Sequence, residues 1–236
     1  MIHAEQQAEH LFIGQAESGH TLLFHTENDH EVEVLLPEGD KPQGKVVIPE
    51  AVECEGRNYT VASIGKQAFM YCSELTEVLI PDSVKIIHPE AFRESGLTAI
   101  QAAGVVGIDY SAFYGCTDLV TVEMPSLRWM GVSAFSRCRQ LANFTLPDTL
   151  GEIPNWAFDF SEGFTRVVVP NSVKRIGDQA FYNNKNLQSV IIPSSVVDIC
   201  SEAFVGTQLG QVIIPNPTAS YRYNAFPEDC EVTQVK

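Results

Sequence analysis

One dipeptide, Ala-Phe, recurs along most of this sequence at a nearly constant spacing. Its eight phenylalanines are separated by 23, 21, 22, 23, 23, 23 and 22 residues, and they are Phe69, Phe92, Phe113, Phe135, Phe158, Phe181, Phe204 and Phe226. Repeats of about 20–50 residues are typical of chains that stack one structural unit on the next. The spacing therefore predicts an elongated solenoid in which each repeat forms one coil.

Each repeat also contains a short segment with the pattern of a strand. In the stretch 75–81, Val78 and Ile80 lie two residues apart and so share one face of a strand, and Pro81 ends the pairing because it has no N–H to donate. A return strand is expected at 84–87, followed by a brief helical turn around the Ala-Phe pair. Successive coils should then stack their strands into parallel sheets.

The full pattern, Leu-x-x-Val-x-Ile-Pro-x-x-Val-x-x-Ile-x-x-x-Ala-Phe-x-x-Cys, resembles the BspA-like class of leucine-rich repeats. The resemblance covers residues 61–230, as about eight repeats of 21–23 residues. It implies an α/β-type solenoid that is mostly β: a right-handed leucine-rich-repeat coil with a parallel strand sheet on the concave face and short turns or 3-10 segments elsewhere. It also implies a bacterial cell-surface or secreted protein that serves in adhesion.

The two ends of the solenoid must be covered, and the flanking residues suit that role. Residues 1–60 lack the Ala-Phe unit but contain strand-like runs at 21–24, 31–36 and 45–49. The third run ends in proline as the repeats do, so we expect an N-terminal cap that includes a half-repeat. Residues 231–236 are expected to form a C-terminal closing strand.

Charge and hydropathy exclude several classes of partner and location. The chain has 236 residues and a net charge of −15, which disfavours nucleic acid because phosphate backbones are repelled. No apolar run approaches the roughly 20 residues of a transmembrane helix. The start, residues 1–6, lacks the features of a signal peptide. An extracellular or cell-surface location would therefore need an export signal outside this numbering, and a cytoplasmic location stays open.

The outward positions of the predicted main strands form the candidate binding surface. Most of one column is polar, and the next column becomes apolar at Val168, Ile191 and Ile213. An exposed apolar stripe often marks an interaction site, although β-branched residues also simply favour strands. The candidate surface comprises Glu77, Leu79, Gln101, Thr121, Glu123, Asn143, Thr145, Arg166, Val168, Ser189, Ile191, Gln211 and Ile213.

Three aromatic residues break columns that are otherwise mostly polar. Trp129 and Trp156 occupy positions where other repeats place Ser, Glu, Gln, Arg or Asp, and Phe160 lies close to Trp156 in the chain. Tryptophan is enriched at binding hot spots, and it stacks on sugars. These residues either pack against a neighbouring turn or form an aromatic contact patch.

The column three residues after each phenylalanine consists of small polar residues. It contains Cys72, Ser95, Cys116, Cys138, Ser161, Asn184 and Thr207. We expect these side chains to hydrogen-bond adjacent coils inside the solenoid. A disulfide between Cys116 and Cys138 is an alternative, since neighbouring coils lie about 4.8 Å apart, and a metal site is another, although the chain has no Cys-x-x-Cys pair.

Histidines are concentrated near the N-terminus, at positions 3, 10, 20, 25 and 30. Spacings of five residues do not place His20, His25 and His30 on one face of a strand, so we interpret them as solvated. A weak metal site is the alternative, and we find no carboxylate constellation in the sequence to support it.

The sequence favours a binding protein over an enzyme. Ser and Asp residues fall in turns that follow the strands, and no nucleophile motif, phosphate loop or dinucleotide fingerprint is present. We expect no catalytic residue, cofactor or metal. The predicted function is non-enzymatic binding of host matrix or cell-surface proteins, and the alternatives are glycan binding and a passive structural spacer.

Overall fold

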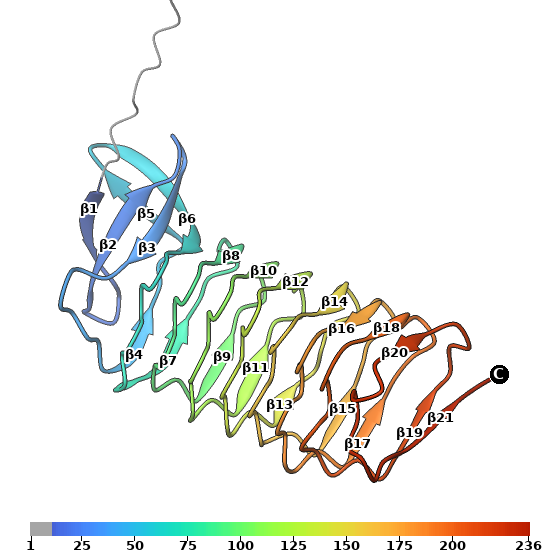
Figure 1. The fold of residues 1–236 in the computed structure, drawn as a ribbon. Helices are drawn as coiled ribbons and strands as arrows, with labels where there is room; N and C mark the ends of the chain where they lie inside the picture. The colour runs from blue at the N-terminus through green and yellow to red at the C-terminus, as the bar shows by residue number, and fades with distance from the viewer. Residues whose placement is uncertain (1–10) are drawn as a thin grey trace, which may run out of the picture.

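The computed structural model describes residues 11–236. These residues form 21 strands and no helix, and the strands build a mostly-β solenoid of about seven turns, because eight Ala-Phe units enclose seven intervals. The coils stack along one axis, with the N-terminal residues at one end and the C-terminus at the other (Figure 1). His3 and His10, and the start of the predicted cap, lie outside the described residues.

The N-terminal part of the chain forms a sheet that continues into the solenoid. Strands β1 (Leu11–Gln15), β2 (Thr21–Thr26) and β3 (Glu31–Leu35) pair antiparallel, and β3 then pairs parallel with β6 (Arg57–Ile64). Strand β5 (Ala51–Cys54) forms a hairpin with β6. Because β6 also pairs with the first return strand, the N-terminal strands and the first return strands form one continuous sheet.

Each repeat contributes a main strand and a return strand, as the pattern predicted. The main strands, which we call the main-strand face, are β4 (Gly44–Val47), β7 (Leu75–Leu79), β9 (Ala99–Gln101), β11 (Thr121–Glu123), β13 (Asn143–Phe144), β15 (Arg166–Val168), β17 (Ser189–Ile191), β19 (Gln211–Ile214) and β21 (Glu231–Gln234). The strands that pair on this face do so in parallel. The predicted half-repeat supplies β4, which pairs with β7.

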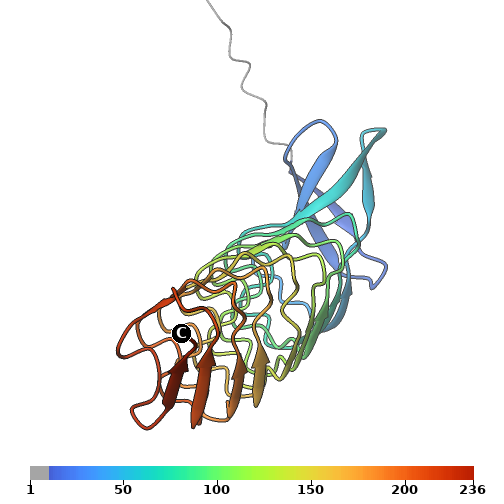
Figure 2. The same ribbon diagram turned by 90° about the vertical axis from the view of Figure 1, so that its right-hand side faces the viewer.

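The return strands form a second face on the opposite side of each coil (Figure 2). They are β8 (Ile86–Ile87), β10 (Gly107–Ile108), β12 (Trp129–Met130), β14 (Glu152–Ile153), β16 (Arg175–Ile176), β18 (Asp198–Ile199) and β20 (Ser220–Tyr221). In the buried interior between the two faces lie the aliphatic columns of the repeat. The core is therefore a continuous rod, and each coil is covered by its neighbours.

The Ala-Phe segment forms a series of turns instead of the expected helical turn. In the first copy, Gln67 and Tyr71 have φ values of 58° and 60°, in the left-handed region. The amides of Gln67, Phe69 and Tyr71 donate to the next coil, to carbonyls of residues 89, 91 and 93 at 3.0, 2.7 and 2.8 Å. Left-handed residues at two positions interrupt the helical succession, and the amides that a helix would use internally instead join neighbouring coils.

The eight Ala-Phe phenylalanines stack inside the solenoid as one column. Seven of these rings are 0–1% exposed, and the last, Phe226, is 7% exposed. Ring centroids of successive coils are 5.0–5.3 Å apart, except for Phe135 and Phe158 at 5.7 Å. The interval between the fourth and fifth coils is therefore the widest.

Most of the small polar column hydrogen-bonds adjacent coils, as predicted, but Cys72 and Thr207 bond to carbonyls of their own coil. Cys116 and Cys138 direct their thiols at the carbonyls of Phe92 and Phe113, at 2.9 and 3.1 Å. Ser161 and Asn184 make the equivalent bonds to the carbonyls of residues 135 and 158, at 2.9 and 2.7 Å. Each of these four side chains donates to a buried carbonyl of the preceding coil, and Cys, Ser and Asn can replace one another there because each supplies a donor.

Candidate binding surface

Both sheets of the solenoid are interrupted at the same step, between the fourth and fifth coils. On the main-strand face one sheet ends at β13 and the next begins at β15; on the other face one sheet ends at β12 and the next begins at β14. The main-strand face alone is interrupted again between β17 and β19. The turns remain joined across the first of these steps, because Phe135 N–H donates to the carbonyl of Ala157 at 2.9 Å. The two coils are thus held together at the Ala-Phe turn while their main strands do not pair.

Two oversized side chains fill the space behind this gap. Phe144 occupies a column of Val and Ile, and Phe164 occupies a column of Leu. The Phe144 ring lies 5.2 Å from that of Phe135 and 6.0 Å from that of Phe158, and the Phe164 ring meets Phe158 edge-on at 5.6 Å. Aromatic rings need more room than the aliphatic side chains they replace, and both rings lie at the step where β13 and β15 do not pair.

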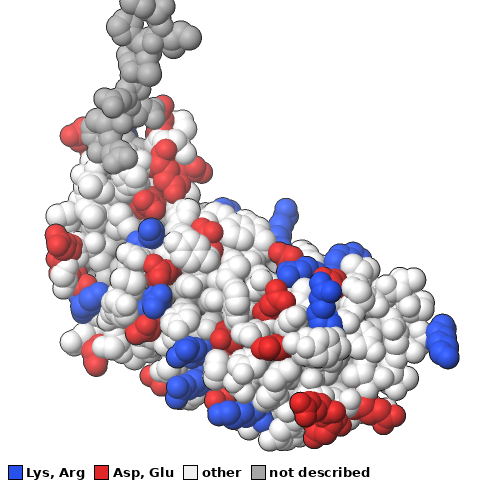
Figure 3. Space-filling view, viewed as in Figure 1, with Lys and Arg blue, Asp and Glu red and all other residues white. Residues whose placement is uncertain are grey.

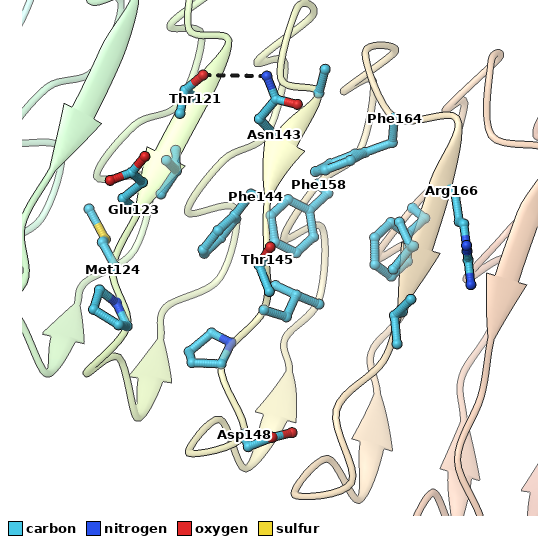
Figure 4. Close-up of a pocket in the computed structure, with 18 residues that line it drawn as sticks. Thr121, Glu123, Met124, Asn143, Phe144, Thr145, Asp148, Phe158, Phe164 and Arg166 are labelled. Carbon is cyan, nitrogen blue, oxygen red and sulfur yellow. Dashed lines mark hydrogen bonds between the residues drawn. The ribbon is translucent and has the colours of Figure 1, made fainter.

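A cavity of about 900 Å³ opens at this gap. In Figure 4, Thr121, Glu123 and Met124 line one side and Phe164 and Arg166 the other, with residues of β13 between them. The floor is aromatic, from the phenylalanines already described. The edge carries Glu123, Asp148 and Arg166, so an apolar floor is combined with a few charged groups, as in many ligand sites.

The structure brings six of the thirteen predicted surface residues to this cavity. They are Thr121, Glu123, Asn143, Thr145, Arg166 and Val168. The other seven lie on the same face, to either side of the cavity: Glu77, Leu79, Gln101, Ser189, Ile191, Gln211 and Ile213. Sequence reasoning placed the residues on one face, but it did not identify the cavity.

Cross-coil contacts order part of the polar side of the surface. Asn143 Nδ2 donates to Thr121 Oγ1 at 3.5 Å, and Gln101 Nε2 donates to Glu123 Oε2 at 3.0 Å. Further along, the Lys45 ammonium contacts the Glu77 carboxylate at 3.1 Å, and both side chains are about half exposed. Exposed contacts of this kind are weak, so they orient side chains more than they stabilise the fold.

The apolar stripe predicted from the sequence is exposed. Val168, Ile191 and Ile213 are 52%, 45% and 55% exposed, and Val168 is in register with Ile191 across β15 and β17. Val168 also lines the cavity. The stripe and the cavity are therefore one continuous surface.

Charged side chains are dispersed over the coils. In the view of Figure 3, acidic and basic residues alternate along the solenoid, with uncharged surface between them. No broad basic area faces the viewer, which agrees with the net charge of −15. A polyanion would find little attraction on this face.

Each of the three predicted aromatic contact residues has local packing contacts. The Trp129 indole covers Gly107 of the neighbouring strand, where an added Cβ would meet the ring at 2.2 Å. Trp156 Nε1 donates to Gln179 Oε1 at 2.6 Å.

Phe160 contacts side chains of both neighbouring coils on the side of the solenoid formed by the Ala-Phe turns (the turn side). The Arg137 guanidinium lies 5.5 Å from the Phe160 ring centre, and Tyr182 meets that ring edge-on at 5.7 Å. These contacts account for an aromatic residue in a polar column without a ligand. No ring contact joins Phe160 to Trp129 or Trp156 in the described part of the chain, so a shared aromatic patch stays a prediction.

The buried cysteines are poor nucleophiles. All six cysteines are free thiols, so Cys116 and Cys138 are not bridged. Burial raises the pKa of Cys116 to about 11, and burial also raises the pKa of Cys138 well above its usual value. A neutral thiol that is fully buried reacts slowly, because the thiolate is the reactive form.

The repeated main strand, turn and return strand define a leucine-rich-repeat solenoid. The chain belongs to the BspA-type leucine rich repeat family, whose model matches residues 57–130 and 107–233 in six copies. A search of curated proteins gave no match. Within the described residues, no helix is long and apolar enough to cross a membrane.

Several solved bacterial structures share the fold. A leucine-rich cell surface protein from Faecalibacterium prausnitzii is 23% identical with a TM-score of 0.67, and the match covers 97% of this chain and 55% of that one. A T. pallidum leucine-rich-repeat protein is 22% identical (TM-score 0.51), with 95% and 83% covered. A leucine-rich repeat protein from Eubacterium ventriosum is 18% identical (TM-score 0.53), with 94% and 50% covered. This chain thus spans about half the length of the first relative.

Proposed function

We propose that this protein is a non-enzymatic, cell-surface or secreted binding module that attaches to host matrix or cell-surface proteins through the main-strand face. The cavity between β13 and β15 would accept an apolar side chain of the partner, and the adjoining stripe of Val168, Ile191 and Ile213 would extend the contact. The proposal retains the right-handed winding and the concave position of this face that the sequence predicts.

The observation that carries the proposal is the continuity of cavity and stripe. An anchor residue in a pocket, surrounded by apolar contacts, is the usual arrangement at protein interfaces. Arg166, Glu123 and Asp148 at the cavity edge would select a partner of complementary charge. Membership of the family and the likeness to a cell-surface protein support an extracellular location and an adhesive role.

The test is a binding assay against immobilised extracellular-matrix proteins and intact host cells. The double variant Val168→Asp, Ile191→Asp should weaken any captured interaction by about tenfold or more, because two charges would enter an apolar contact. The matched control is Val132→Asp, Val197→Asp, at side chains that are 42% and 48% exposed and lie outside the main-strand face.

Equal binding by the two double variants would reject the main-strand face as the contact surface. Failure of the unmodified protein to bind anything in the panel would favour a passive spacer. Loss of binding in both double variants would indicate a general effect of added charge and would also count against the proposed surface.

A further inference from the structure

A cluster of potential metal ligands lies where the N-terminal strands meet the first coils. Glu27, Glu33 and His88 each offer one ligand atom, and these atoms all lie within 4.8 Å of one another. Glu27 follows β2, Glu33 is in β3, and His88 follows the return strand β8. The three residues therefore come from both sides of the junction.

The register of the sheet explains why these residues meet. Glu33 pairs with Ser63 across β3 and β6, and Ser63 pairs with Ile86 across β6 and β8. His88 lies two residues beyond Ile86, so it points to the same face of the sheet. Glu27 is likewise two residues beyond His25, which pairs with Glu33.

The imidazole of His88 is held in the orientation that metal-binding histidines adopt. Its Nδ1 lies 3.3 Å from Asp109 Oδ2, and its Nε2 lies 3.7 Å from Glu27 Oε1. A carboxylate that accepts the proton of one ring nitrogen leaves the lone pair of the other nitrogen for a metal. Asp109 would thus fix the tautomer that presents Nε2 to an ion.

The two carboxylate ligands are supported in the same way. Ser63 Oγ donates to Glu27 Oε1 at 2.8 Å, and His25 Nδ1 contacts Glu33 Oε1 at 2.8 Å. Gly65 leaves room for the Glu33 carboxylate, since a Cβ there would lie 2.8 Å from Glu33 Oε2. Partners of this kind hold the ligand oxygens in place before an ion arrives.

The charge of the cluster favours a cation. Glu27, Glu33 and Asp109 form ion pairs here with histidine, and within the described residues none of them pairs with Lys or Arg. One imidazole nitrogen and two carboxylate oxygens, with no thiolate, are a donor set that suits divalent transition metals. Zn²⁺ accepts His and Glu ligands at about 2.0–2.2 Å, and the three candidate ligand atoms already lie within 4.8 Å of one another.

We propose that Glu27, Glu33 and His88 bind a divalent transition-metal ion, with Zn²⁺ as the best match, and that the ion ties the N-terminal sheet to the first coils. Water would complete the coordination. His25, Ser63 and Asp109 are positioning residues, because they contact the ligands and not the ion.

The experiment is calorimetric titration of the untagged, EDTA-treated full chain with Zn²⁺. His3 and His10 are changed to Gln in every protein of the series, so that the N-terminal imidazoles do not contribute. We expect about one equivalent to bind and the melting temperature to rise with Zn²⁺. Glu33→Gln and His88→Gln should abolish this binding, and Asp109→Asn should weaken it about 10–100-fold.

His20→Gln is the matched control, because His20 contacts Ser18 and lies outside the cluster; it should bind Zn²⁺ as the parent does. Melting in EDTA checks that each variant is folded, and Glu27→Gln, at a side chain more exposed than that of Glu33, replaces any variant that is not. X-ray absorption should show nitrogen and oxygen ligands. No binding by the parent, undiminished binding by the folded ligand variants, or sulfur ligands would each overturn the proposal.

Discussion

The Ala-Phe turns and the main strands belong to the same repeats, yet they differ in continuity. The turns donate hydrogen bonds from coil to coil along the whole solenoid, including across the step from Phe135 to Ala157. The main strands do not pair at that step, between β13 and β15, nor between β17 and β19. The difference shows that the turn side provides the connection between coils, so the strand side can be opened to form a cavity without dividing the solenoid.

The largest expected effect is the loss of a ring from the turn side. Phe113→Ala should lower the free energy of unfolding by about 3–5 kcal/mol, because the ring is fully buried and stacks on Phe92 and Phe135. Urea denaturation measures this loss. The control Tyr110→Ala, at a side chain that is 46% exposed, should cost much less. Equal losses for the two variants would contradict the stabilisation that we assign to the stacked phenylalanine column.

A smaller loss is expected from the polar column next to the rings. Asn184→Ala removes one of two donors to the buried Phe158 carbonyl: the Asn184 amide at 2.7 Å is lost, and the Ser161 N–H at 3.1 Å remains. The expected cost is about 0.5–1.5 kcal/mol in the same assay, the net contribution of one hydrogen bond. Asn184→Ser keeps a donor, as Ser161 does in the previous coil, and should recover part of the loss. No difference between Ala and Ser would show that the hydrogen bond contributes nothing.

The strand side can be tested by removing the cause of the gap. Phe144→Val together with Phe164→Leu installs the side chains usual in these columns, and the fourth and fifth coils should then pair. Amide exchange of Arg166–Val168 should slow by about fivefold, as expected for new hydrogen bonds worth about 1 kcal/mol each. Amides of Thr121–Glu123, in a strand that already pairs on both sides, are the internal control, whereas Arg166–Val168 pairs only with β17. Unchanged exchange at 166–168 would mean that the rings are not what separates the strands.

The smallest effect concerns a carboxylate on the turn side of the same step. Burial raises the pKa of Asp159, whose Oδ1 is buried and has no hydrogen-bond partner among the described residues. The ionised form is therefore disfavoured in the folded state, and this penalty is complete above the raised pKa and disappears below the ordinary value near 3.8. Asp159→Asn should stabilise the protein by about 1 kcal/mol or less at pH 7.

Thermal denaturation of both proteins between pH 7 and pH 3.5 checks this prediction. The advantage of Asp159→Asn should shrink as the pH falls, because the wild-type carboxyl becomes neutral. An advantage that is independent of pH would show that shape, and not charge, is responsible.

Much of the candidate surface could be predicted because its residues follow the repeat. The period of two in a strand puts Val168, Ile191 and Ile213 on one side of their strands, and the structure exposes all three. The sequence also contained a signal for the cavity, since Phe144 and Phe164 are oversized for their columns. The size of a side chain alone does not predict whether two coils accommodate a larger ring or lose the pairing of their main strands. That outcome depends on how the surrounding residues pack.

The candidate metal cluster could not be found from the sequence. We found no carboxylate constellation for the N-terminal histidines, yet the structure places Glu33 opposite His25 at 2.8 Å. His88, about 60 residues further along the chain, completes the group. The pairing of β3 with β6 brings these residues together, and a register between strands distant in sequence is a tertiary property.

The sequence by itself determined the repeating coil, because each column of the repeat meets the same column of its neighbours, and identical local requirements recur every 21–23 residues. The tertiary structure alone decided the exceptions: the gap between β13 and β15, and the meeting of Glu27, Glu33 and His88 at the N-terminal junction. Both depend on how one coil or sheet packs on another that differs from it, and a periodic pattern contains no information about such unlike contacts.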